Sequence, residues 1–233
     1  MTSNVLPPEV LDQAVQRRGT LHALADFDPA KSALLVIDMQ NFFIDMMPDA
    51  LGIVPSISRL AASLRLAGGQ VAWVSMTVDA TDRSQWPVFF ERLLSETWRD
   101  AHLQSLARDS EGWQLCPGLE PADEDWRIEK SRFSAFIQGS SDLEARLRAQ
   151  GIETLLIAGT ATNVCCESTA RDAMMLNFGT IFVSDACIGT DADAHRATLA
   201  NFQTIFGDVL SVDEILAGID QTVQIDSATL RNI

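Results

Sequence analysis

Short apolar segments rich in Val, Leu and Ile alternate with segments of helical periodicity along this chain of 233 residues. The candidate strands are residues 33–38, 70–76, 126–130, 154–159, 180–184 and a short run near Val209. Strands that are apolar at nearly every position are buried on both faces, as in parallel sheets covered by crossover helices. The alternation therefore predicts an α/β fold, a doubly wound sheet of about six mostly parallel strands with helices on both faces.

Two of the intervening segments carry helix boundary signals. Residues 56–67 have helical spacing and are followed by two glycines, which commonly end helices. Within residues 141–150, Ser141 and Glu144 have the spacing of a capping box, and Gly151 follows as a terminator. Both segments are expected to be helices that connect strands.

The chain is expected to form one domain over residues 1–233, because 47% apolar residues in a chain of this length suit a single large core. Residues 1–30 are interpreted as a helical lead-in. Residues 78–125 contain three tryptophans among many charges and are interpreted as a partly helical excursion that covers the substrate. A surface insertion packed by its own aromatic residues explains this segment equally well.

The charge balance restricts the possible partners. Asp and Glu number 32 against 17 Lys and Arg, so the formal charge of -15 repels nucleic acids and anionic membranes, and neither is expected as a partner. Residues 1–25 contain no apolar run long enough for a signal peptide or a membrane span, so a cytoplasmic location is expected. The four irregularly spaced cysteines are interpreted as free thiols.

Two charged residues end predicted strands, where ligand sites of open parallel sheets gather. Asp38 ends the strand 33–38, and Lys130 ends the strand 126–130. Each also has a structural interpretation, because an aspartate can cap a turn and a lysine at a strand end is commonly solvated.

The segment Gly159-Thr-Ala-Thr-Asn-Val-Cys165 leads from a predicted strand into a predicted helix. With Thr162 or Asn163 as the N-cap, Cys165 lies in the first turn, where the helix dipole and a nearby ammonium would lower the pKa of its thiol. A lowered pKa is one way in which cysteine nucleophiles are activated. The alternative, a small buried hydrophobic residue, is preferred for Cys166.

The usual strand order places the first strand beside the fourth, so that Asp38 and the Cys165 turn face each other at the topological switch point. The long side chain of Lys130 can then span the remaining gap. Together they would supply a nucleophile, a proton acceptor and a cation.

Three segments in this order resemble the isochorismatase-like cysteine hydrolases. They are Leu35-Val-Ile-Asp-Met-Gln-Asn41, Glu129-Lys-Ser-Arg-Phe-Ser-Ala-Phe136, and Gly159-Thr-Ala-Thr-Asn-Val-Cys165 with Glu167-Ser-Thr-Ala-Arg-Asp-Ala173. The family includes nicotinamidases and amidohydrolases of N-carbamoylsarcosine, biuret and ureidoacrylate. The amino-acid sequences of these motifs most resemble those of the ureidoacrylate and carbamoyl-amide branches.

The resemblance implies a catalytic triad of Asp38, Lys130 and Cys165 and cleavage of a small amide-like C–N bond through a thioester. It also implies an oxyanion hole made by the backbone N–H groups of Ala161 and Cys165, with a cis peptide between Thr160 and Ala161. Such donors commonly contribute a factor of about 100 to 1,000 in rate.

No metal or cofactor is expected. Nicotinamidases of the family that bind a metal place an Asp-x-His cluster after the second strand, whereas Ser75 to Trp86 contains no histidine. The histidines His22, His102 and His195 show no ligand spacing. Nicotinamide is therefore a less favoured substrate, and the family relationship implies a homo-oligomer, either a dimer or a tetramer.

A small-ligand site usually has an apolar wall with few polar anchors. The candidate substrate contacts are Asn41, Phe42, Trp86, Phe133, Phe136 and Thr162. Each of them is also compatible with a role in the core.

Three other functions remain open on the sequence. The first is a vinyl ether hydrolase of the isochorismatase type, but members that cleave isochorismate can lack the cysteine, so Cys165 favours C–N hydrolysis. The second is a thiol redox sensor that uses Cys165 and Cys166. The third, a non-catalytic binding module, is disfavoured by the complete set of three catalytic residues.

Overall fold

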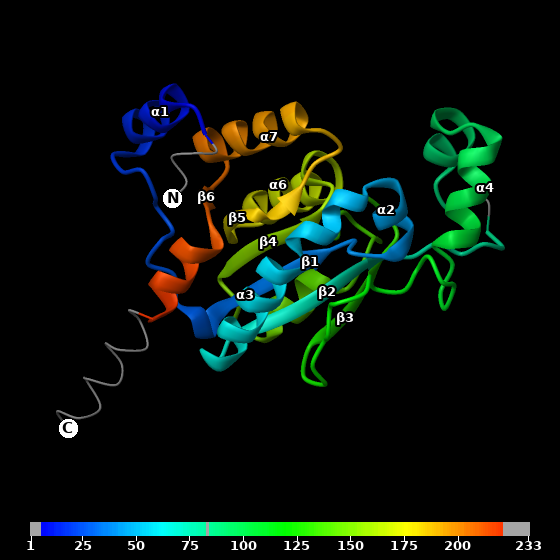
Figure 1. Cartoon of the computed structure of the whole chain (residues 1–233), viewed down its shortest axis with the longest axis horizontal. Coiled ribbons are helices and arrows are strands. Elements are labelled where there is room, and N and C mark those ends of the chain that lie inside the picture. Colours follow the sequence, from blue (N-terminus) through cyan, green and yellow to red (C-terminus); the bar gives the residue numbers. More distant parts are fainter. Residues whose placement is uncertain (1–5, 83, 221–233) are drawn as a thin grey trace.

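A six-stranded parallel sheet forms the centre of the computed structural model, which describes residues 6–82 and 84–220 (Figure 1). The strand order is β3-β2-β1-β4-β5-β6. The strands are β1 (Ser32–Ile37), β2 (Gln70–Met76), β3 (Trp126–Lys130), β4 (Thr154–Thr160), β5 (Gly179–Ile188) and β6 (Asp208–Leu210). The expected α/β class is confirmed, and β1 lies beside β4 as the topological argument requires.

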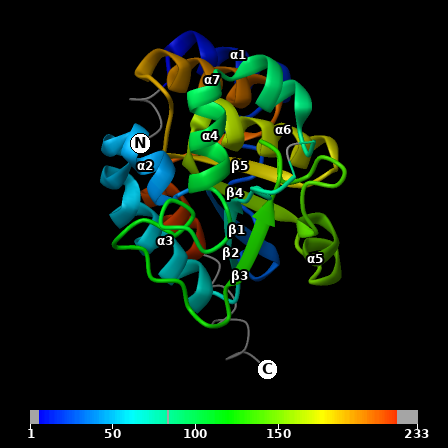
Figure 2. The ribbon, with the colours of Figure 1, turned by 90° about the vertical axis from the view of Figure 1, so that its right-hand side faces the viewer.

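Helices cover both faces of the sheet (Figure 2). The α-helices of the structure are α1 (Pro8–Arg18), α2 (Asn41–Met46), α3 (Val54–Leu66), α4 (Glu96–Ser105), α5 (Leu143–Ala149), α6 (Glu167–Met175) and α7 (Ala192–Ile205), of which α4 projects away from the sheet (Figure 1). Shorter helical turns are η2 (Pro29–Lys31), η3 (Pro48–Ile53), η4 (Val88–Leu93) and η5 (Thr162–Cys166), of which the last two are π-helical.

Successive residues of β1 divide the core into two layers, because side chains alternate between the faces of a strand. Leu34 and Val36 join the cluster that contains the buried face of α3. Leu35 and Ile37 join the cluster that contains buried residues of α5, α6 and α7. Because both layers are apolar, β1 is buried along its whole length. The packing on both faces fixes the position of its last residue, Ile37.

Two local predictions differ from the structure in detail. The predicted capping box does not form, because Ser141 Oγ accepts from Leu143 N at 3.2 Å rather than from Glu144 N, while Glu144 pairs with Arg148, and the helix begins at Leu143. The predicted strand 180–184 continues to Ile188, past the polar Asp185. That carboxylate accepts a hydrogen bond of 2.8 Å from Val212 N, which lets the strand extend.

Within the lead-in and the excursion, residues 1–5 and 83 lie outside the described residues. α1 packs on α7, and Arg18 at its end donates to Gly207 O at 3.0 Å. The excursion carries η4 and α4, which project to the right in Figure 1. Among the described residues, no helix combines the length and the apolar character that crossing a membrane requires.

The excursion is attached to the sheet at both of its ends. At the start, Thr77 N donates to Lys130 O at 2.8 Å. At the end, Cys116 N donates to Met39 O at 2.9 Å, and Asn41 N donates to Gln114 O at 2.9 Å. These backbone hydrogen bonds tie both ends of the excursion to the carboxyl ends of β1 and β3.

Candidate active site

Asp38 lies directly after β1, at the carboxyl edge of the sheet, and is fully buried. Its backbone has φ +51°, a left-handed conformation that aspartate adopts more readily than most residues. Its N–H donates to Val74 O, and its Oδ1 accepts from Met76 N at 2.9 Å. Gly159 of β4 lies so close to β1 that a Cβ added to it would be 2.1 Å from Ile37 O. The backbone of β1, β2 and β4 thus fixes the carboxylate.

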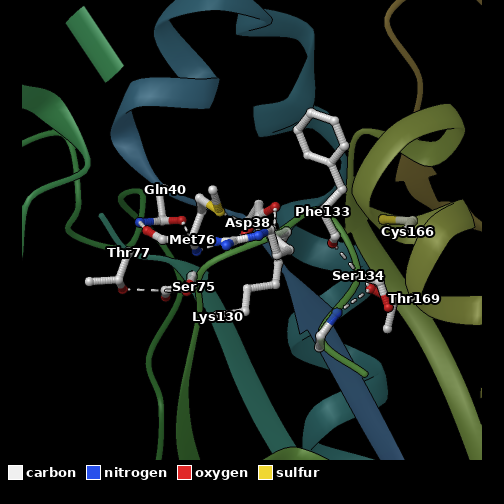
Figure 3. Close-up of polar contacts among 12 residues, drawn as sticks. Asp38, Gln40, Ser75, Met76, Thr77, Lys130, Phe133, Ser134, Cys166 and Thr169 are labelled. Carbon is white, nitrogen blue, oxygen red and sulfur yellow. Dashed lines mark hydrogen bonds and ion pairs between the residues drawn. The ribbon is translucent and has the colours of Figure 1, made fainter. Parts of the chain in front are cut away.

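Lys130, the last residue of β3, reaches across β2 to Asp38 (Figure 3). Its Nζ donates to Asp38 Oδ2 at 2.8 Å and to Arg132 O at 3.1 Å, and both side chains of the ion pair have 0% exposure. Burial would lower the pKa of Lys130, but the charge of Asp38, aided by interactions with Asp38 and Cys165, prevails and raises it above its ordinary value. The buried amine is therefore held as an ammonium ion.

Cys165 is buried at the end of the turn that follows β4. Burial, together with the negative charge of Asp38, raises the pKa of the Cys165 thiol well above its ordinary value, and the opposing effect of Lys130 does not offset this. The expected lowering of the pKa is therefore wrong. The resting state is a protonated thiol that interacts with a carboxylate and an ammonium, so ionisation of the sulfur requires transfer of its proton to a nearby base.

The raised pKa has a measurable consequence. The rate at which iodoacetamide alkylates Cys165 should keep rising with pH through the ordinary thiol pKa of about 8.5 instead of levelling off near neutrality. Peptide mass spectrometry would follow the modification at Cys165 separately from the other three cysteines. A plateau below about pH 7 would instead show a stable thiolate.

The turn before Cys165 differs from the predicted helix start. The π-helical η5 lies between β4 and α6, and α6 begins only at Glu167, so Cys165 precedes that helix. Neither predicted N-cap is one, because Thr162 Oγ1 lies 2.8 Å from His195 Nδ1 and Asn163 bonds to Thr190. The side chains of Thr162 and Asn163, which the sequence predicts to cap the helix, instead form hydrogen bonds to α7 and to the β5–α7 loop.

One implied oxyanion donor, the N–H of Ala161, lies directly before this turn, and the other, the N–H of Cys165, lies within it. The peptide between Thr160 and Ala161 is cis. Ala161 O accepts hydrogen bonds from Val164 N at 3.0 Å and from Cys166 N at 3.2 Å. The N–H groups of Ala161 and Cys165 thus belong to one compact loop that begins at the end of β4 and contains the candidate nucleophile.

An aromatic cluster lies beside the candidate catalytic residues. Trp86 and Phe89, from the excursion, have ring centroids 4.9 Å and 5.2 Å from that of Phe133, and Phe42 belongs to the same cluster. The guanidinium of Arg132 lies 5.1 Å from the Trp86 ring, and its Nη2 donates to Gln85 O at 2.5 Å. The predicted contacts Phe42, Trp86 and Phe133 are thus brought together.

The other three predicted contacts lie apart from this cluster. Asn41 Nδ2 donates to Glu111 O at 2.9 Å, so its amide holds the end of the excursion. The ring of Phe136 packs 5.9 Å from that of Phe178, in the layer that contains α5 and α6. The hydroxyl of Thr162 bonds to His195 as described above.

Sequence reasoning missed Gln40, a fully buried residue two positions after Asp38. Its Oε1 accepts from Met76 N at 2.8 Å, and its Nε2 donates to Met76 O and to Trp113 O, each at 3.0 Å (Figure 3). Gln40 therefore links the end of β2 to the excursion beside Asp38. Its position in the Asp-Met-Gln-Asn motif could have indicated a role near Asp38. Its hydrogen-bond partners, Met76 and Trp113, are distant in sequence and could not be predicted.

Over residues 6–82 and 84–220, no group of three or more His, Cys, Asp or Glu side chains is arranged to hold a metal ion. His102 contacts the aromatic cluster, and its Nδ1 lies 2.7 Å from Trp98 O. His195 is the histidine nearest in sequence to the nucleophile turn, and it bonds to Thr162.

Comparisons with known proteins agree on one family. A family model described as the Isochorismatase domain matches residues 32–214. The ureidoacrylate amidohydrolase RutB of Acinetobacter baylyi is 33% identical over 198 residues, which cover 77% of this chain and 80% of that protein.

Solved structures give the same result. A cysteine hydrolase from Pseudomonas syringae pv. phaseolicola matches with a TM-score of 0.74 and 28% identity, over 84% of this chain and 95% of that one. An N-carbamoylsarcosine amidase from Thermoplasma acidophilum matches with a TM-score of 0.64 and 26% identity, over 78% and 97% of the two chains.

Proposed function

Because the chain belongs to the isochorismatase family of hydrolases, we propose that it is a cysteine amidohydrolase that cleaves a C–N bond in a small amide, carbamoyl or ureido compound. The observation that carries this proposal is the buried Asp38–Lys130 ion pair, with Nζ and Oδ2 2.8 Å apart, and its electrostatic interaction with the Cys165 thiol. A nucleophile, a base and a fixed cation are the groups that acyl transfer needs.

The first half of the proposed reaction forms a thioester. Asp38 takes the proton of the Cys165 thiol while the sulfur attacks the substrate carbonyl, and the backbone N–H groups of Ala161 and Cys165 bind the resulting oxyanion. The tetrahedral intermediate collapses as the C–N bond breaks, and Asp38 returns the proton to the leaving nitrogen. Lys130 stays charged throughout and keeps the Asp38 carboxylate in place.

The second half of the reaction restores the enzyme. Asp38 takes a proton from a water molecule while the oxygen of that water attacks the thioester carbonyl. The C–S bond then breaks, the acid product leaves, and the proton returns to the sulfur of Cys165. The step consumes one water molecule and requires no redox partner.

The names of the relatives point to the substrate class. Ureidoacrylate and N-carbamoylsarcosine both carry a carbonyl bonded to nitrogen, with an acidic group elsewhere in the molecule. We propose that the excursion 78–125 covers such a substrate. Its proposed contacts are Phe42, Trp86 and Phe133 as an apolar wall, with Asn41, Phe136 and Thr162 at the margins.

Several finer features belong to the same proposal. The enzyme acts without a metal, consists of one domain, works in the cytoplasm, and forms a dimer or tetramer with no nucleic acid or membrane partner.

A panel of small ureido, carbamoyl and primary amide compounds tests the function. Ammonia release should be detected for at least one ureido or carbamoyl compound, and it should be unchanged after dialysis against EDTA. Nicotinamide and a vinyl ether substrate serve as comparison compounds. Activity that EDTA removes and an added metal restores would overturn metal independence, while turnover of the vinyl ether alone would overturn C–N hydrolysis.

A further inference from the structure

We propose that His195 is a positioning residue for this reaction, because it holds, through Thr162, the turn that carries both oxyanion donors. The proposal rests on the proposed cysteine amidohydrolase function. His195 is in the first turn of α7, whereas Thr162 begins η5, directly after Ala161 and three residues before Cys165. The side chain of Thr162 is thus the point at which α7 reaches the catalytic turn.

The contact between these two residues is short and partly buried. Thr162 is fully buried and His195 is half-buried, and Thr162 Oγ1 lies 2.8 Å from His195 Nδ1. Burial, followed by the positive charge of Arg196, lowers the pKa of His195, so the ring is neutral near pH 7. A neutral ring adds no charge to the site, and its effect on the reaction therefore comes through the geometry of the turn.

A second pair of hydrogen bonds holds the adjacent residue in the same way. Asn163 Nδ2 donates to Thr190 Oγ1 at 2.9 Å, and Thr190 N donates to Asn163 Oδ1 at 3.0 Å. Gly189, directly before Thr190, packs so closely on α7 that a Cβ added to it would lie 2.9 Å from His195 Cβ. Thr190 of the β5–α7 connection and His195 of α7 therefore hold η5 at two consecutive residues, and both have little room to shift.

The turn needs such external support because of its own geometry. A π-helical turn is a rare conformation that is found most often at functional sites. Inside η5 the carbonyl of Ala161 accepts from both Val164 N and Cys166 N. The two oxyanion donors, Ala161 N–H and Cys165 N–H, lie on opposite sides of Thr162 in the chain, so a displacement of Thr162 changes their separation.

Loss of this contact should therefore weaken binding of the transition state more than binding of the substrate. His195→Leu removes the partner of the buried hydroxyl, and it should lower kcat about tenfold to a hundredfold while KM changes less than about twofold. His195→Asn should recover most of the rate, since its side-chain amide offers a hydrogen-bonding atom near the position of Nδ1. His22→Gln is the matched control at the opposite end of the sheet and should keep full activity.

Two further readouts separate positioning from structural damage. Alkylation of Cys165 by iodoacetamide creates no oxyanion, so its rate should be the same in His195→Leu and in the wild type. If His195→Leu folds poorly, Thr162→Val tests the same contact with a side chain of the same shape. The double variant should be no slower than either single variant, because both remove one interaction.

The outcomes distinguish this inference from the function on which it rests. An unchanged kcat in both His195→Leu and Thr162→Val would overturn the positioning role. A parallel loss of kcat, alkylation rate and melting temperature would also overturn it, in favour of a purely structural contact. If instead Cys165→Ala retains wild-type activity, the proposed function fails whatever the His195 variants show.

Discussion

Cys165→Ala should lower ammonia release by a factor of about 10⁴ or more, because it removes the atom that forms the thioester. The fold should survive, since the change deletes one buried sulfur and leaves the Asp38–Lys130 ion pair intact. Steady-state ammonia release and thermal unfolding followed by circular dichroism measure the two effects. Intact-protein mass spectrometry of the wild type during turnover should also detect an acyl adduct on Cys165.

The adjacent cysteine provides the control. Cys166 is fully buried, and its Sγ lies 4.0 Å from Ala158 O, inside the core layer that contains α6. Cys166→Ala should therefore retain most of the turnover and lose only a little stability. Substantial activity in Cys165→Ala would exclude the thioester route. A reversible oxidation product at low peroxide in the absence of any hydrolysis would instead support the thiol sensor.

Lys130→Met should destabilise the protein by about 3–5 kcal/mol and remove activity, because it leaves the carboxylate of Asp38 buried without its partner. Methionine has a similar length, so the loss would come from the charge and its hydrogen bonds to Asp38 and Arg132. Urea unfolding would give the change in free energy, and ammonia release would give the activity.

An exposed lysine pair provides the comparison. Lys31 Nζ lies 3.0 Å from Glu153 Oε1, nearly the same separation as in the buried pair, but the lysine side chain is 52% exposed. Lys31→Met should therefore destabilise the protein far less than Lys130→Met, because solvent screens the exposed pair. Adding Asp38→Asn to Lys130→Met should restore part of the stability but none of the activity. Equal costs for the two lysine variants would contradict the role assigned to burial.

The sheet and the meeting of Asp38 and Lys130 at its edge were predictable because their signals are local. Strands buried on both faces have continuous apolar runs, and in a parallel sheet their carboxyl ends lie at one edge. Asp38 directly follows such a run, and Lys130 is the last residue of a shorter strand in which charged residues alternate with Trp126 and Ile128, so their meeting depended on the strand order. The order places β1 between β2 and β4, which brings both residues and the Cys165 turn to the same edge.

The local details of the nucleophile turn were not predictable in this way. Five residues of π-helix have no periodic pattern, and the partners of Thr162 and Asn163 lie 33 and 27 residues away. The direction of the Cys165 pKa shift depends on burial by side chains from several elements, which outweighs the ammonium of Lys130. Contacts that join distant segments decide both features.

The attachment of the excursion at both ends has an evolutionary consequence. Thr77, directly before it, is held by the end of β3, and Gln114 and Cys116, near its end, are held by the segment after β1. Trp86 and Phe89 lie in the span between these points. In terms of the proposed function, exchange of this span during evolution would alter the wall that covers the substrate, while the hydrogen bonds at both points would keep Asp38 and Lys130 in place.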